Sequence, residues 1–74
     1  MIVKTQDFYL TAYLSLKGLE IIDLEDWDNR KLFVFEDNEE YQKAKRDYYY
    51  NEALVSPLQF KQKIRELKAL IASK

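Results

Sequence analysis

The stretch Lys31-Leu32-Phe33-Val34-Phe35-Glu36 predicts a β-strand that is apolar on both of its faces. Successive side chains of a strand point to opposite faces, so the two phenylalanines share one face, and Leu32 and Val34 share the other. A strand of this kind needs cover on both sides, and a lone two-stranded hairpin is only marginally stable in water. We therefore expect helices to cover this strand, or a further strand to pair with it.

The apolar segment before it, residues 19–26, predicts the partner strand of a β-hairpin. Asp28 and Asn29 lie between the two segments, and both residue types adopt turn or left-handed geometry readily. The spacing predicts a connection longer than two residues. Trp27 lies in that connection, and we expect its side chain to pack as a lid over the hairpin.

Residues 6–17, on the N-terminal side of the hairpin, are predicted to form a helix. Thr5 is a good N-cap, and Gly18 can adopt the left-handed conformation that closes a helix. Apolar side chains cover nearly the whole circumference of this segment apart from a narrow polar stripe. Two arrangements would bury it: a central position in the domain, or a surface shared with a second copy of the chain.

Two further helices are predicted after the hairpin. The first starts at Asp37 or Asn38 and runs to about Tyr50. The second starts at Ser56-Pro57, where an N-cap serine precedes a proline at the first helical position. Between them, Ala53-Leu54-Val55 is an apolar connector or a brief third strand. The sequence therefore predicts a small α+β domain in the order α-β-β-α-α, with a β-hairpin covered by helices.

The composition limits the domain count and the chemistry. The chain has 74 residues, 47% of them hydrophobic and 34% charged, with a formal net charge of -1. It is short enough to predict one compact domain, 1–74, and apolar enough to predict an ordered one. Cysteine and histidine are absent, which removes disulfides, thiolate nucleophiles, the commonest metal ligand and the usual general base. We expect a protein that is not an enzyme, with no cofactor, no metal and no small-molecule substrate.

The charges and apolar runs also bear on location and partners. No apolar run approaches the roughly 20 residues that span a bilayer, so we expect a cytoplasmic protein without a membrane partner. Residues 19–40 are acidic and residues 57–74 are basic. These charges either attract each other within the fold or form a basic surface for an acidic partner.

The run Asp47-Tyr48-Tyr49-Tyr50 contains more aromatic rings than one core face can accept. At the helical period, Tyr48 shares an inner face with Tyr41 and Ala44, whereas Tyr50 lies on an outer stripe beside cationic side chains. Aromatic rings beside cations are typical of surfaces that bind a partner or a nucleic acid. The candidate binding residues are Lys43, Arg46, Tyr49, Tyr50, Lys61, Arg65 and Lys68.

Two stretches, read together, carry a family resemblance: Thr5-Gln6-Asp7-Phe8-Tyr9-Leu10-Thr11-Ala12-Tyr13-Leu14 with Lys17-Gly18, and residues 47–60 with their Ser56-Pro57 helix start. The chain resembles a family of small uncharacterised domains from bacteria, archaea and their viruses. The resemblance implies no established activity and no catalytic residues. It implies nucleic-acid binding and a viral or mobile-element setting.

Two functional hypotheses follow from these patterns. The first is a small non-enzymatic interaction module that self-associates, as a homodimer, or binds a protein partner. The alternative is a nucleic-acid-binding domain that uses the Tyr, Lys and Arg side chains as its surface. Paired carboxylates, Asp23 with Glu25 or Asp26 with Asp28, are the remaining acid-base or metal groups. The stretch Asp26-Trp27-Asp28 lacks the glycine and the distal glutamate of a calcium loop.

Overall fold

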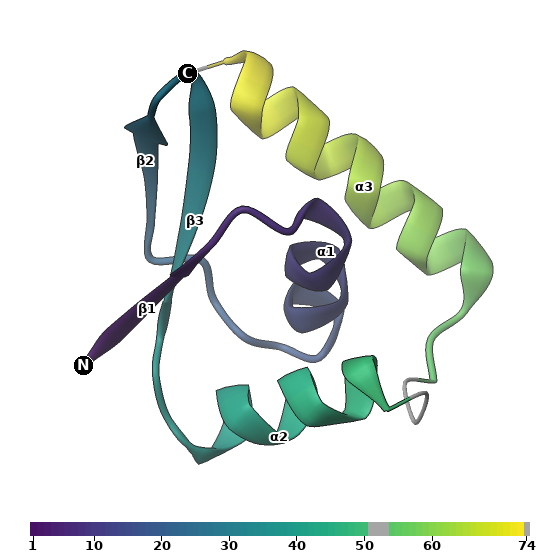
Figure 1. Ribbon diagram of the computed structural model, residues 1–74. Helices are drawn as coiled ribbons and strands as arrows, with labels where there is room; N and C mark the ends of the chain where they lie inside the picture. The colour runs from purple at the N-terminus through teal and green to yellow at the C-terminus, as the bar shows by residue number, and fades with distance from the viewer. Residues whose placement is uncertain (51–53, 74) are drawn as a thin grey trace.

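A computed structural model describes residues 1–50 and 54–73 of the chain. Its elements, in order, are β1 (Ile2–Thr5), α1 (Phe8–Leu16), β2 (Asp23–Trp27), β3 (Arg30–Glu36), α2 (Glu39–Tyr49) and α3 (Pro57–Ala72). The strands form an antiparallel sheet in the order β1-β3-β2. The helices of the described residues all lie to one side of this sheet (Figure 1). The predicted α+β class is confirmed.

The N-terminal strand β1 corrects the predicted element order. Val3 lies opposite Phe35 and Thr5 opposite Phe33, so β1 occupies the side of β3 that the hairpin leaves unpaired. Thr5 is therefore a strand residue, and the N-cap of α1 is Asp7, whose side chain accepts a hydrogen bond from the Leu10 N–H at 3.0 Å. The order is β-α-β-β-α-α rather than α-β-β-α-α.

The other segment considered as a third strand, residues 53–55, forms no strand at the two of its positions that the structure describes. Ala53 lies outside the described residues, and Leu54 and Val55 form no strand. The strand that β3 requires on its second side comes instead from the beginning of the chain.

The hairpin differs from its prediction in its turn and in its first strand. The connection has only two residues, Asp28 and Asn29, with φ angles of 49° and 65°. Positive φ at both positions is what a type I′ turn requires, so these residues close the hairpin directly between Trp27 and Arg30. The prediction of a longer connection was wrong. Trp27 is consequently a strand residue, is 59% exposed, and does not form a lid.

The helix α1 is the centre of the core. Leu10, Ala12, Tyr13 and Leu14 are all buried, and α1 packs against both α2 and α3. The Phe8 ring meets the Phe33 ring of the sheet edge-on at 6.0 Å between centroids. Of the two arrangements that the sequence allowed, the central position is the one observed, and this explains why α1 is apolar on nearly every side.

The starts of α2 and α3 follow their sequence signals. Asn38 accepts a hydrogen bond from the Tyr41 N–H at 2.9 Å, and Ser56 accepts one from the Gln59 N–H at 3.4 Å. Pro57 is the first residue of α3, as predicted. Within the described residues, none of the helices has the length and apolarity needed to cross a membrane.

Candidate functional site

The tyrosines at the end of α2 differ in burial as the helical period predicts: Tyr48 faces the core and Tyr50 faces outward. Tyr41 and Ala44 are buried, and Tyr48 is half-buried on the same side of the helix. The Tyr48 ring lies 5.5 Å from the Tyr13 ring of α1. This ring therefore joins α2 to the central helix and is not displayed to a partner.

Tyr49 has a structural contact that sequence reasoning missed. Its hydroxyl donates to Asp7 Oδ2 at 3.2 Å, and its ring meets Tyr48 edge-on at 5.2 Å. Burial, followed by the nearby Asp7 carboxylate, raises the pKa of Tyr49. Because Asp7 is also the N-cap of α1, Tyr49 links the end of α2 to the start of α1. No local pattern could reveal this contact, since the two residues are 42 positions apart.

Tyr50 is the most exposed of the three tyrosines, at 73%. It lines a shallow depression of about 370 Å³ together with Lys43, Arg46 and Asp47. Lys43 Nζ lies 2.9 Å from Asp47 Oδ2, so one carboxylate lies among the cations. The depression offers a ring for stacking and cations for an anion, and the carboxylate reduces its positive charge.

The candidate cations of α3 lie on a different part of the molecule. The helix begins near the end of α2 and then runs away from it along α1 (Figure 1). Lys61, Arg65 and Lys68 are all exposed, and Lys68 lies about 10 Å further along the axis than Lys61. The structure thus brings Lys43, Arg46 and Tyr50 together but does not add the α3 cations to the same depression.

The outer face of the sheet, opposite the helices, is the second exposed feature of interest. Ile2 is 53% exposed there, and Trp27 is 59% exposed. Lys4 of β1 and Glu25 of β2 form an ion pair at 2.8 Å that crosses the central strand β3. Val34 lies on this face between those strands and is only 1% exposed. Side chains of the sheet itself, rather than a helix, cover it.

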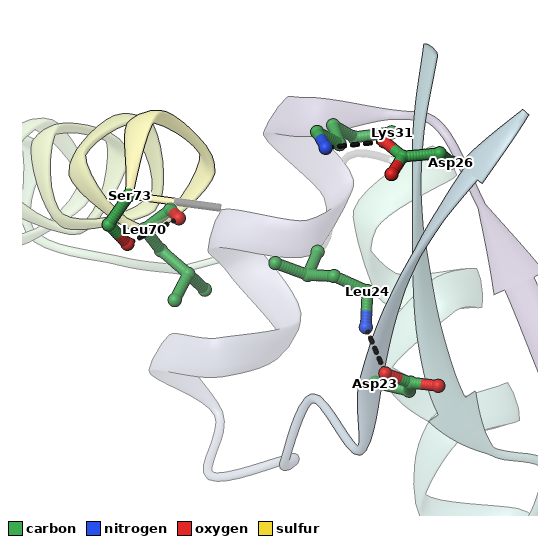
Figure 2. Close-up of polar contacts among 6 residues, drawn as sticks. All are labelled: Asp23, Leu24, Asp26, Lys31, Leu70 and Ser73. Atoms are coloured by element: carbon green, nitrogen blue, oxygen red, sulfur yellow. Dashed lines mark hydrogen bonds and ion pairs between the residues drawn. The ribbon is translucent and has the colours of Figure 1, made fainter. Parts of the chain in front are cut away.

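The edge of the sheet formed by β2 is blocked. The Leu24 N–H donates to the carboxylate of its neighbour Asp23 at 2.8 Å (Figure 2). Asp26 of the same strand forms an ion pair with Lys31 of β3. Three of the five residues of β2 are acidic. Charge and side-chain hydrogen bonds on an edge strand oppose pairing with another strand.

The edge formed by β1 lacks these features. Its residues are Ile2, Val3, Lys4 and Thr5, and its sole charged side chain is Lys4. In the described sheet, β1 pairs with β3 on one side and with no strand on the other. Sequence reasoning missed this edge because it missed the strand.

Comparison with known proteins gives a family and no function. A family model described as a domain of unknown function (DUF5659) matches residues 2–73. The chain belongs to this family. Its resemblance to uncharacterised domains is thereby confirmed. No curated protein and no solved structure matches this DUF5659 chain.

The carboxylates of the DUF5659 domain are already engaged or dispersed where the structure describes them. Asp23 accepts the Leu24 N–H, Glu25 pairs with Lys4, and Asp26 pairs with Lys31. Among residues 1–50 and 54–73, no group of three or more acidic side chains could hold a metal ion. The features that stand out in the described residues are therefore surfaces: the α2 depression, the outer sheet face and the β1 edge.

Proposed function

We propose that this DUF5659 domain is a small non-enzymatic interaction module that associates with a second copy of itself or with a protein partner through its sheet. One observation carries the proposal: the helices of the described residues cover a single face of the sheet, and Ile2 and Trp27 remain more than half exposed on the other. Aromatic residues such as tryptophan are enriched in the centres of protein interfaces.

The outer face has the mixed chemistry of a protein-binding surface. Apolar Ile2 and Trp27 lie beside the Lys4–Glu25 ion pair, and Glu36 is exposed on the same face. A partner that covers this face buries apolar area and meets charges of both signs. Charge pairs at the rim of an interface favour one orientation of the partner over others.

Light scattering over a concentration series tests the self-association. We expect a dimer whose formation weakens when Ile2 is changed to Lys. Leu58→Lys is the matched control, because Leu58 is 74% exposed but lies on α3, away from the sheet. A protein whose association is weakened equally by both substitutions would contradict the assignment to the sheet.

The sole tryptophan of the chain provides a second test. Trp27 lies on the outer face, so a partner that covers this face would shift its fluorescence emission to shorter wavelength and reduce its quenching by acrylamide. Binding that leaves Trp27 emission unchanged would place the partner elsewhere than over the Trp27 end of this face.

A second candidate function, nucleic-acid binding, is favoured by the depression that Lys43, Arg46 and Tyr50 line together. Binding of labelled single-stranded oligonucleotides should fall steeply with salt if these cations contact phosphates. Arg46→Ala and Tyr50→Ala should weaken binding with the helical circular dichroism unchanged. Arg65→Ala on α3 is the control and should have a smaller effect, since α3 runs away from the depression.

The setting of the protein is part of the same proposal. We expect it to act in the cytoplasm, with a viral or mobile-element origin as the resemblance implies. Gene neighbourhood tests the origin, because genes for replication, packaging or defence beside this one would support it and a housekeeping operon would oppose it.

A further inference from the structure

The backbone of β1 presents hydrogen-bonding groups away from the sheet. The Asp37 N–H donates to the Met1 carbonyl at 3.0 Å, so the backbone of Met1 points toward β3. Val3 and Thr5 follow Met1 at every second position, and their backbone groups point the same way. In an antiparallel ladder, alternate residues bond to the neighbouring strand and those between them point outward. The N–H and C=O groups of Ile2 and Lys4 therefore point away from β3 and outward from the open edge.

The second edge of the sheet does not offer an equivalent site. Leu24 is an outward-pointing residue of β2 by the same alternation, and its N–H already donates to Asp23. Symmetrical pairing of two β2 strands about their central residue would place Glu25 opposite Glu25 of the second copy. Like charges directly opposite each other in a ladder are destabilising. Of the two edges, β1 is the one suited to pairing.

We propose that two copies of this chain pair β1 to β1 in antiparallel orientation and so form one continuous six-stranded sheet. This inference rests on the proposed function and names its partner, a second copy, and its site, the β1 edge. The twofold axis passes beside Val3, so Val3 faces Val3 of the second copy. Ile2 of each copy then lies opposite Lys4 of the other, and their outward groups form four backbone hydrogen bonds.

The charges of the outer face favour this register. Ile2 lies opposite Glu36 within the domain, so Glu36, Ile2 and Lys4 of the second copy form one row across the new sheet. Lys4 already reaches across one strand within its own domain, to Glu25 at 2.8 Å. It can therefore reach across Ile2 of the other copy to Glu36, which also accepts a hydrogen bond from the Met1 amino group at 3.2 Å.

Both alternative symmetrical registers are less favourable. A register centred on Ile2 keeps one hydrogen-bonded residue pair instead of two. The register centred on Lys4 has a different fault. It would place Lys4 directly opposite Lys4 of the second copy, which brings two like charges together. In the proposed register the exposed Ile2 side chains of the two copies are diagonal neighbours on the outer face, about 7 to 8 Å apart, which is within reach of apolar contact.

Single cysteines test the register, because the natural chain contains none. Val3 and its symmetry mate form a non-hydrogen-bonded pair, in which Cα atoms are about 4.5 Å apart, within the range of a disulfide. In a thiol–disulfide buffer, Val3→Cys should give a covalent dimer. Ile2→Cys, one residue away, is the control and should remain largely reduced, because its mate is at a diagonal position.

Charge reversal tests the cross-copy contact between Lys4 and Glu36. Lys4→Glu alone and Glu36→Lys alone each place like charges together at two symmetrical points, so each variant should dimerise roughly tenfold more weakly than the natural chain. An equal mixture of the two variants should recover dimers, because each reversed residue then meets an opposite charge on the other chain. Circular dichroism of each variant checks that the fold is retained.

The outcomes separate this inference from the proposed function. Recovery in the mixture together with the Val3→Cys disulfide supports β1 pairing. Suppose instead that both charge variants dimerise as strongly as the natural chain and that Val3→Cys forms no disulfide. This result overturns β1 pairing but is compatible with self-association through another surface. A chain that remains monomeric at every concentration overturns both β1 pairing and self-association. It leaves the other form of the proposed function, a protein partner, with an extended segment of that partner as the occupant of this edge.

Discussion

Two neighbouring residues of the central strand, Val34 and Phe35, are equally buried but by different means. Each is 1% exposed. Phe35 faces the helices, and its ring lies 6.0 Å from the Tyr41 ring of α2. Val34 faces the opposite way, where the Lys4–Glu25 ion pair crosses the strand. The inner face is covered by packed helices, whereas Val34 on the outer face is covered by side chains of the sheet that are themselves partly exposed.

The largest effect is expected on the inner face. Phe35→Ala removes a ring from beneath α2 and should lower the free energy of unfolding by about 3 to 5 kcal/mol. Small domains are stabilised by about 5 to 15 kcal/mol in total, so this variant should be close to unfolding at room temperature. Urea unfolding followed by circular dichroism measures the change.

Phe35→Leu is the control for this change, because it keeps much of the volume and should cost less. A cost of under about 1 kcal/mol for Phe35→Ala would mean that the inner face is not close-packed, and would remove the contrast with Val34.

A smaller effect is expected for Val34. Val34→Ala removes the equivalent of two methylene groups and should cost about 1 to 2 kcal/mol. Val34→Thr keeps the branched shape, and its hydroxyl can reach water if the ion pair shifts, so its cost should be less than that of Val34→Ala. A cost above about 2 kcal/mol for Val34→Thr would show that the outer face excludes water as the inner face does.

The sequence predicted the parts of this fold that depend on local signals. The Ser56 cap was located correctly, and the cap of α2 is Asn38, one of the two residues predicted for it. The doubly apolar strand predicted at 31–36 is observed as Arg30–Glu36. Each of these features acts through residues near it in the chain. The strand β1 could not be located in this way. Ile2–Thr5 is only four residues long, and it is a strand because Phe33 and Phe35 offer it a pairing partner some 30 residues later.

The same distinction applies to the candidate site. Helical phase separated Tyr48 from Tyr50 because both belong to one helix. The Tyr49–Asp7 hydrogen bond and the separation of the α3 cations from the α2 depression depend on how helices pack, which no single segment encodes. The open β1 edge follows from the strand order and became visible only with the sheet.

Alkaline pH should act on the core through its buried tyrosines, Tyr13 and Tyr41. Burial, followed by the Asp37 carboxylate, raises the pKa of Tyr41 above its ordinary value of 10.0, and burial also raises the pKa of Tyr13. The folded state therefore holds these protons more tightly than the unfolded chain. This stabilisation is fully present below pH 10 and is lost as the pH rises through the folded-state values.

Urea midpoints measured at several pH values on both sides of the tyrosine pKa test this expectation. Tyr41→Phe cannot ionise and should lose less stability on alkaline titration than the natural chain. An unchanged pH profile in this variant would show that Tyr41 ionises as easily in the folded state as in the unfolded chain.

The smallest effect is expected for the ion pair on the outer face. The side chains of Lys4 and Glu25 are 44% and 35% exposed, so water and salt screen their attraction. Lys4→Met removes the charge but keeps a long apolar stem, and should change the free energy of unfolding by less than about 0.5 kcal/mol.

Lys4→Ala also removes the stem that lies over β3 and should cost more than Lys4→Met, because it uncovers Val34. Urea unfolding of both variants, at low salt and at concentrations where the chain is monomeric, separates the contribution of the Lys4 charge from that of its apolar stem. Equal costs for the two variants would mean that the Lys4 stem does not cover Val34, and that Val34 owes its burial to other neighbours.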